Sequence, residues 1–163
     1  MRILWGRMPL PKPKVIRKVY RSDLDQEPYL IWNSFIDLIA VTDYEDLSEI
    51  QRIAHLAFLY ESEVQNGGHL QYFENRGVGQ IGETLDALER LGAICHRTVL
   101  QAASEGIASD PRGKILTIEE YIRRASEGEY DEYDLAYAEC RPEMREYLET
   151  YLRANLKEFV ELE

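Results

Sequence analysis

The sequence predicts an all-α fold, a single-domain multi-helix bundle with an extended basic N-terminal arm. Apolar residues recur at helical spacing along most of the chain, and no segment of useful length shows the alternation of a strand. The chain has 163 residues, which suits one domain with a substantial core. Hydrophobic residues make up 45% and charged residues 30%, a balance typical of globular rather than disordered proteins.

The chain divides into a basic arm, residues 1–21, and an acidic helical domain, residues 22–163. The arm holds seven basic residues and no acid, and prolines at positions 9, 11 and 13 favour an extended backbone. Its apolar residues could dock it, with a short strand, onto a larger surface. We expect the arm to lie across an acidic surface of its own body or of a second subunit.

In the first half of the domain, the sequence predicts two long helices and a short one. Residues 28–41 carry apolar side chains at helical spacing. The next helix should run to about residue 65 and, being apolar nearly all round, should be central. Its start is ambiguous, because two capping boxes are possible: Thr42 with Glu45, and Ser48 with Gln51. The Asn66-Gly67-Gly68 stretch should end it before a short helix near 69–75.

In the second half of the domain, the sequence predicts further helices joined by short turns. Thr117 and Glu120 form a possible capping box for one of them. Pro142 opens the last helix, whose apolar stripe extends from Met144 to Val160. The predicted segments are 80–92, 94–108, 118–126, a short helix near 132–140, and the helix that follows Pro142.

No catalytic or metal-binding motif is present in the sequence. His55, His69 and His96 form no close ligand pair, and the two cysteines have no metal-binding spacing. We therefore expect no enzymatic activity, no cofactor and no metal. Two thiols in a chain without other cysteines suggest a reducing compartment. With no signal-peptide pattern and no membrane-spanning run, this predicts a cytoplasmic protein.

One polar cluster around Asn66 keeps an alternative open. A partly buried Glu61 could have a raised pKa and act as a general acid or base. The same side chains could equally satisfy the backbone groups left unpaired at a helix break. The cluster comprises Glu61, Glu63, Gln65, Asn66, His69, Gln71, Glu74 and Asn75. An enzyme or small-ligand-binding domain built on it is the second hypothesis.

The charge distribution indicates the class of partner. The formal net charge is −11, although the arm is basic, so the domain itself is strongly acidic. Such a domain repels nucleic acid and anionic membranes and attracts basic proteins, although acidity also serves solubility alone. The candidate partner-binding carboxylates lie in two helical rows and one acidic segment: Glu83, Asp86 and Glu89; Glu143, Glu146 and Glu149; and Glu127, Glu129, Asp131, Glu132 and Asp134.

A motif in the middle of the chain resembles a known family. Residues 63–75, EVQNGGHLQYFEN, resemble the E-V-x-N-G-G-x-x-Q-[FY]-F-x-N core of a bacterial domain family of largely unknown function, which includes a dimeric DNA-mimic protein. Residues 84–93 also resemble that family's helix ending in Gly-Ala. The resemblance covers roughly residues 45–105. The motif positions, expected to be mainly structural, are Glu63, Asn66, Gly67, Gly68, Gln71, Phe73 and Asn75.

The resemblance implies an all-α, dimeric domain with no known enzymatic activity or cofactor. In the DNA-mimic member, surface carboxylates stand in for phosphates at a DNA-binding protein's site. The leading hypothesis is therefore a non-enzymatic protein that presents an acidic surface to a basic partner, possibly a DNA-binding protein, without binding nucleic acid or membranes itself. A third hypothesis is an interaction or immunity module whose partner is selected by shape rather than charge.

Overall fold

The computed structural model describes residues 14–109 and 113–163, and within them the fold is an all-α bundle, as predicted. The helices are α1 (Arg21–Leu24), α2 (Leu30–Val41), α3 (Glu49–Arg76), α4 (Ile81–Leu91), α5 (Ile94–Ser109), α6 (Ile118–Ser126), α7 (Asp131–Glu139), α8 (Met144–Ala154) and α9 (Leu156–Phe159). A short 3-10 turn, Tyr44–Asp46, precedes α3. Two three-residue strands, β1 (Arg17–Val19) and β2 (Val160–Leu162), pair in parallel with Arg17 opposite Val160.

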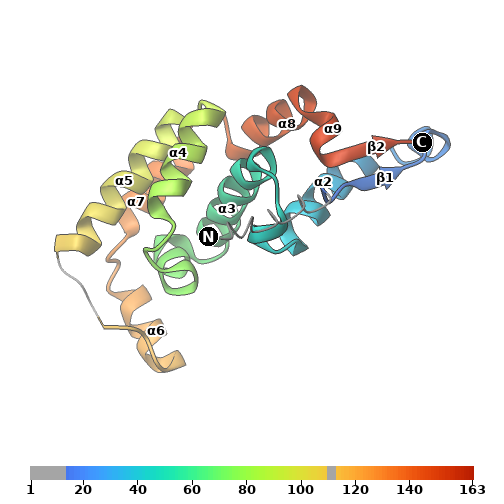
Figure 1. Cartoon of the computed structure of the whole chain (residues 1–163). Coiled ribbons are helices and arrows are strands. Elements are labelled where there is room, and N and C mark those ends of the chain that lie inside the picture. Colours follow the sequence, from blue (N-terminus) through green and yellow to red (C-terminus); the bar gives the residue numbers. More distant parts are fainter. Residues whose placement is uncertain (1–13, 110–112) are drawn as a thin grey trace, which may run out of the picture.

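Helix α3 is the central element, as its apolar circumference predicts. It packs against α2, α4, α7 and α8, and Figure 1 shows these helices arranged around it. Ser48 and Gln51 form the capping box that begins it, which resolves the ambiguity in favour of the second candidate. The helix is interrupted where predicted, because Gly67 and Gly68 have non-helical backbone angles. The core around α3 includes the fully buried Tyr60.

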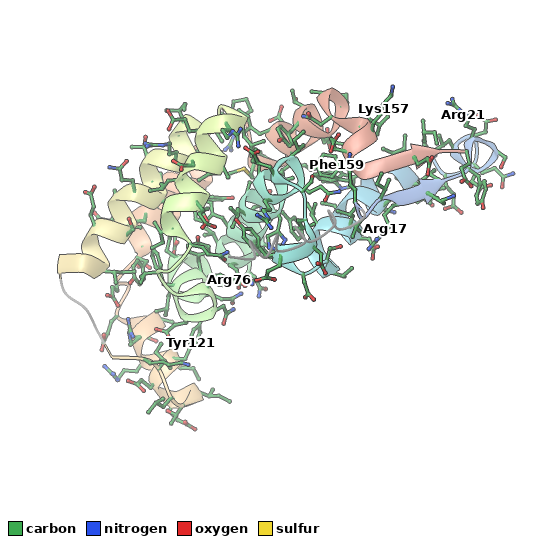
Figure 2. The ribbon with its side chains drawn as sticks, in the orientation of Figure 1. Arg17, Arg21, Arg76, Tyr121, Lys157 and Phe159 are labelled. Atoms are coloured by element: carbon green, nitrogen blue, oxygen red, sulfur yellow. A yellow bond between two sulfur atoms is a disulfide. The ribbon has the colours of Figure 1, made fainter. Side chains whose placement is uncertain are left out.

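The described end of the arm, residues 14–21, docks on its own body. Gln51 is completely buried, and its amide donates to the backbone carbonyls of Val15 (2.7 Å) and Glu158 (2.6 Å), joining arm and C-terminus. Ion pairs link Arg17 with Asp37 (2.6 Å), Lys14 with Glu158, and Lys18 with Glu163. Residues 1–13 lie outside the described residues. Figure 2 shows Arg17 and Arg21 at the end of the molecule that carries both strands.

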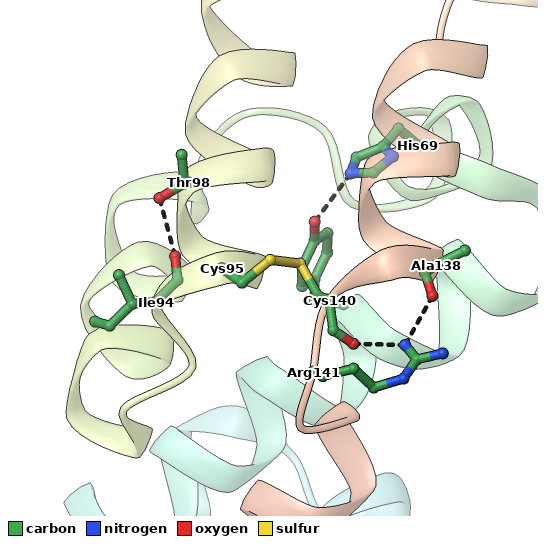
Figure 3. The surroundings of a disulfide bond; sticks show 8 residues. His69, Ile94, Cys95, Thr98, Ala138, Cys140 and Arg141 are labelled. Carbon is green, nitrogen blue, oxygen red and sulfur yellow. Dashed lines mark hydrogen bonds between the residues drawn. A yellow bond between two sulfur atoms is a disulfide. The ribbon is translucent and has the colours of Figure 1, made fainter.

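The cysteine prediction is wrong, because Cys95 and Cys140 form a disulfide rather than two free thiols. Their Cα atoms lie 5.7 Å apart although 45 residues separate them. Packing of α5 against α7 brings them together, which spacing along the sequence could not reveal. Figure 3 shows the bond joining α5 to the end of α7. The cysteine argument for a reducing compartment therefore has no support.

The end of one helix and the cap of another also differ from the sequence prediction, although α6 begins and ends at the predicted residues. The helix predicted to open at Pro142 begins at Met144, after the N-cap Glu143, and ends at Ala154. Phe159 and Val160 belong to α9 and β2, where both are buried. At α6, the Thr117 side chain accepts from the Glu120 backbone as predicted, but the Glu120 carboxylate accepts from the Leu116 backbone. The capping box is thus only half formed. Separately, none of the helices in the described ranges has the length and apolarity to cross a membrane.

Candidate functional site

Side chains of the family motif form a hydrogen-bonded network that spans the break in α3 at Gly67 and Gly68. The carboxylate of Glu63 accepts hydrogen bonds from Gln71 (2.8 Å), Asn75 (2.7 Å) and Arg76 (3.1 Å). Burial opposes ionisation of Glu63, but these donors outweigh it and the pKa of the carboxyl is lowered. Asn66 donates to Gln71 (3.3 Å), and Phe73 is buried in the core. The network ties together the two halves of α3.

His69, the first residue after the two glycines of this break, is held by a separate set of hydrogen bonds. Its ring is fully buried, with Nδ1 2.6 Å from Asp134 Oδ1 and Nε2 2.9 Å from the Tyr60 hydroxyl. Asp134 also accepts from the His69 backbone N–H at 2.8 Å. A single carboxylate of α7 therefore satisfies the backbone donor exposed by the kink and orients the ring. Figure 3 shows the His69 ring directed at the tyrosine hydroxyl.

The polar cluster singled out in the sequence is thus divided among several places. Glu61 lines a surface pocket that also includes Gln65 and Asn66, and its carboxylate accepts from Gln65 (3.1 Å) and not from the donors of Glu63. Burial raises the pKa of the Glu61 carboxyl to about 6, with a nearby Arg145 opposing the shift. Glu63 and His69 are engaged in internal hydrogen bonds. In the described ranges, no three His, Cys, Asp or Glu side chains are arranged to bind a metal ion.

The row on α4 faces away from the core. Thr84, Ala87 and Leu88 are the buried residues of this helix, whereas Glu83, Asp86 and Glu89 are exposed. Glu83 accepts from the Tyr44 hydroxyl (2.8 Å) and Glu89 pairs with Arg97 (3.3 Å). No basic side chain of the described residues pairs with Glu83 or Asp86.

The acidic segment before and within α7 has both inward and outward members. Glu127 pairs with Arg123 (2.6 Å), and Glu129 with the buried Arg124 (3.1 Å). Asp134 is committed to His69. Asp131 and Glu132 remain exposed, and no base of the described residues pairs with either. Among the described residues, Asp131 and Glu132 are thus the two exposed acids of this segment that have no basic partner.

In the row of acids on α8, Glu143 and Glu146 mainly cap the N-terminus of the helix. Glu143 and Glu146 form a reciprocal capping box, in which the Glu146 carboxylate accepts from the Glu143 backbone (3.1 Å). Glu149 pairs with Arg145 (2.9 Å) one turn away. Capping leaves Glu143 and Glu146 exposed and charged, so they still contribute to the outward field.

Sequence reasoning missed two buried basic groups. Arg124 on α6 is only 6% exposed and donates to Glu74 (3.4 Å), Glu129 (3.1 Å) and the Gly113 carbonyl (3.3 Å). These bonds hold α6, which projects from the body and makes few contacts with other helices (Figure 1). His96 is 1% exposed, and burial lowers its pKa to about 4. Two acids that could pair with Arg124, Glu127 and Glu129, lie nearby in the sequence. Only the folded structure shows that Glu129 is the one of these two that does so.

The comparison with family models identifies the chain. A model described as DMP19-like protein matches residues 45–155, more than half of the sequence. The chain belongs to the DMP19-like family. Neither a curated protein nor a solved structure matches it. The family match extends beyond the motif to α8, so the Glu63 network, the His69–Asp134 contact and all the candidate acids lie within the family region.

The neutral His96 predicts acid sensitivity. Its folded pKa of about 4 lies below the unfolded value of 6.5, so the folded protein binds fewer protons between these values and loses stability as the pH falls through them. We expect His96 to account for a loss of about 2 kcal/mol between roughly pH 7 and pH 4.5. Urea unfolding of wild type and His96→Phe at both pH values measures this difference.

Glu61 provides the opposing control for that experiment. Its folded pKa of about 6 lies above the ordinary glutamate value of 4.5, so the folded state gains relative stability as the pH falls through this range. Glu61→Gln should therefore increase the net acid sensitivity, whereas His96→Phe should reduce it. Equal pH dependence in wild type and His96→Phe would contradict the assignment.

Proposed function

We propose that this DMP19-like protein is a non-enzymatic binding protein whose acidic surface, centred on α4 and α7, is recognised by a basic DNA-binding protein. The surface is defined by Glu83, Asp86, Asp131 and Glu132, with Glu143 and Glu146 at the start of α8 extending it. In this role the carboxylates occupy positions that DNA phosphates take on the partner. The supporting family match covers all these residues.

The observation that carries the proposal is the separation of acidic and basic side chains along the molecule. Residues 81–109 and 113–139 hold twelve acidic and five basic side chains. Three of the arm's four described cations, Lys14, Arg17 and Lys18, pair with Glu158, Asp37 and Glu163, at the end that carries β1 and β2. Figure 1 places α4, α5 and α7 at the opposite end. The described arm therefore leaves the α4–α7 charge uncompensated.

The spacing of charge requires several elements to act together. Duplex DNA carries about one charge per 1.7 Å of axis, whereas one outward acid per helical turn supplies about one per 5.4 Å. Glu83 and Asp86 on α4, and Asp131 and Glu132 on α7, supply carboxylates from separate helices of one chain. A homodimer, which the family resemblance implies, would bring a second set. Encounter with a basic partner should be fast and sensitive to salt.

A charge-neutralising variant tests the proposal. We expect a basic protein retained by immobilised wild type at low salt to be released both by added salt and by duplex DNA. The combined variant Glu83→Gln, Asp86→Asn, Asp131→Asn, Glu132→Gln should weaken this binding at least about tenfold. The measurement is the dissociation constant as a function of salt concentration.

The control variant removes an equal number of exposed acids at the other end of the molecule. Asp23→Asn, Asp25→Asn, Glu27→Gln and Glu161→Gln leave the described ion pairs intact and should bind as wild type does. Equal losses in both variants would indicate non-specific attraction. Binding unaffected by either variant would favour the charge-independent interaction module. Retention of no basic protein at low ionic strength would overturn the proposal.

A further inference from the structure

A pocket lies between the break in α3, helices α5 and α7, and the start of α8. Its volume is about 410 Å³, within the roughly 300–1,000 Å³ range of small-molecule sites. Val64, Met144 and the disulfide-bonded Cys140 give it apolar walls, and His96, Tyr137 and Glu143 are among its polar lining residues. The pocket thus combines apolar walls with several polar and charged side chains.

Two of the lining side chains have buried polar atoms with no partner. His96 is 1% and Tyr137 8% exposed, and neither the His96 Nδ1 nor the Tyr137 hydroxyl has a hydrogen-bond partner among the described residues. A buried polar group without a partner costs about 1–3 kcal/mol. Both side chains line the pocket, so a bound ligand that reaches these atoms would supply the missing hydrogen bonds. A neutral imidazole, the form that burial of His96 favours, has one nitrogen that can accept.

The charges around the pocket select the type of ligand. Asp134 and Glu143 line it. Burial and then the charges of Glu61 and Glu143 raise the pKa of the Tyr137 hydroxyl, so this hydroxyl lies in a negative potential. Arg141 is the basic lining residue. Burial and then the charge of Arg141 lower the pKa of His96, so the potential is less negative at the His96 ring than at the Tyr137 hydroxyl. The Arg141 guanidinium donates to the backbone carbonyls of Ala138 (2.8 Å) and Cys140 (2.7 Å), as Figure 3 shows.

We propose that this pocket binds the ammonium or guanidinium end of an aliphatic chain. The cation donates to the Tyr137 hydroxyl, the His96 ring and the Glu143 carboxylate, and the chain packs on Val64 and Met144. The cation belongs either to a free alkylamine or alkylguanidine, or to a lysine or arginine side chain of a bound protein. This site shares Glu143 with the extension of the α4–α7 surface, but it does not depend on the function proposed for that surface.

Titration of the full chain with small cations tests the site. We expect n-butylammonium and n-butylguanidinium to bind saturably and to shift the NMR signals of the His96 ring, whereas n-butanol and butyrate do not. Tyr137→Phe removes one hydrogen bond to a charged group and should weaken binding about tenfold. Glu143→Gln, which retains an oxygen to cap α8, should weaken it similarly. Tyr133→Phe, on the same helix outside the pocket lining, should leave it unchanged.

The comparison ligands also distinguish the two sources of the cation. A blocked Gly-Lys-Gly peptide that binds as tightly as n-butylammonium would assign the site to a protein side chain. Binding of the free amine alone would assign it to a small molecule. Saturation by n-butanol equal to that by the cations, no saturation by any cation, or wild-type affinity in Tyr137→Phe would overturn the proposal. Because none of these readouts uses the α4–α7 acids, they are independent of the partner-binding test.

Discussion

Removal of the Cys95–Cys140 disulfide is expected to lower the free energy of unfolding by about 4 kcal/mol, the entropic value for closing a loop of this length. The two cysteines are 45 residues apart in sequence, so the bond excludes many conformations of the unfolded chain. The closed loop contains most of α5, all of α6 and α7, and the segment between them. Urea unfolding of oxidised wild type and of the Cys95→Ser, Cys140→Ser double variant measures the loss.

Reduced wild type serves as the control for the double variant. Cys140 is 1% exposed, so replacing it with serine also places a hydroxyl in the core, at a cost separate from the loss of the bond. Reduction without substitution isolates the bond itself. If reduced and oxidised wild type unfold at the same urea concentration, the disulfide does not constrain the unfolded chain in the way proposed.

The helices could be predicted from the sequence because their signals are local. Ser48 and Gln51, the glycines at the break in α3, and the spacing of Ile81, Leu85 and Leu88 each act within a few residues. The same holds for the outward direction of the α4 acids. A helix repeats every 3.6 residues, so the position of its buried face determines which side chains face outward.

The features that were missed depend on contacts between distant segments. Asp134 was a candidate surface acid, but it is committed to His69, 65 residues away. Glu129 and Arg124 pair at a buried position on α6, and the cysteines meet only because α5 packs on α7. No local pattern marks such partners. An acidic segment therefore shows how much charge is present, while the fold determines which charges remain uncompensated.

Substitution of Gly68 by alanine should destabilise the protein by about 3–5 kcal/mol through two separate effects. Gly68 has φ 71° and ψ −172°, a conformation that residues with a Cβ adopt only with strain of about 1–3 kcal/mol. An added Cβ would also overlap the Asp134 carboxylate. Displacing this carboxylate removes the acceptor for the backbone and ring of the buried His69, which costs about a further 2 kcal/mol.

Gly77 separates the two effects, because it has nearly the same backbone conformation without the neighbour. Its φ is 64° and ψ −158°, and a Cβ there would meet nothing within 4 Å. Gly77→Ala should therefore show the backbone strain alone, about 1–3 kcal/mol. The excess in Gly68→Ala measures the Asp134–His69 contact, and it should disappear in an Asp134→Ala background, where the overlap and the contact are both absent. Equal losses for the two glycines in the wild-type background would show that the carboxylate contributes nothing to the break in α3.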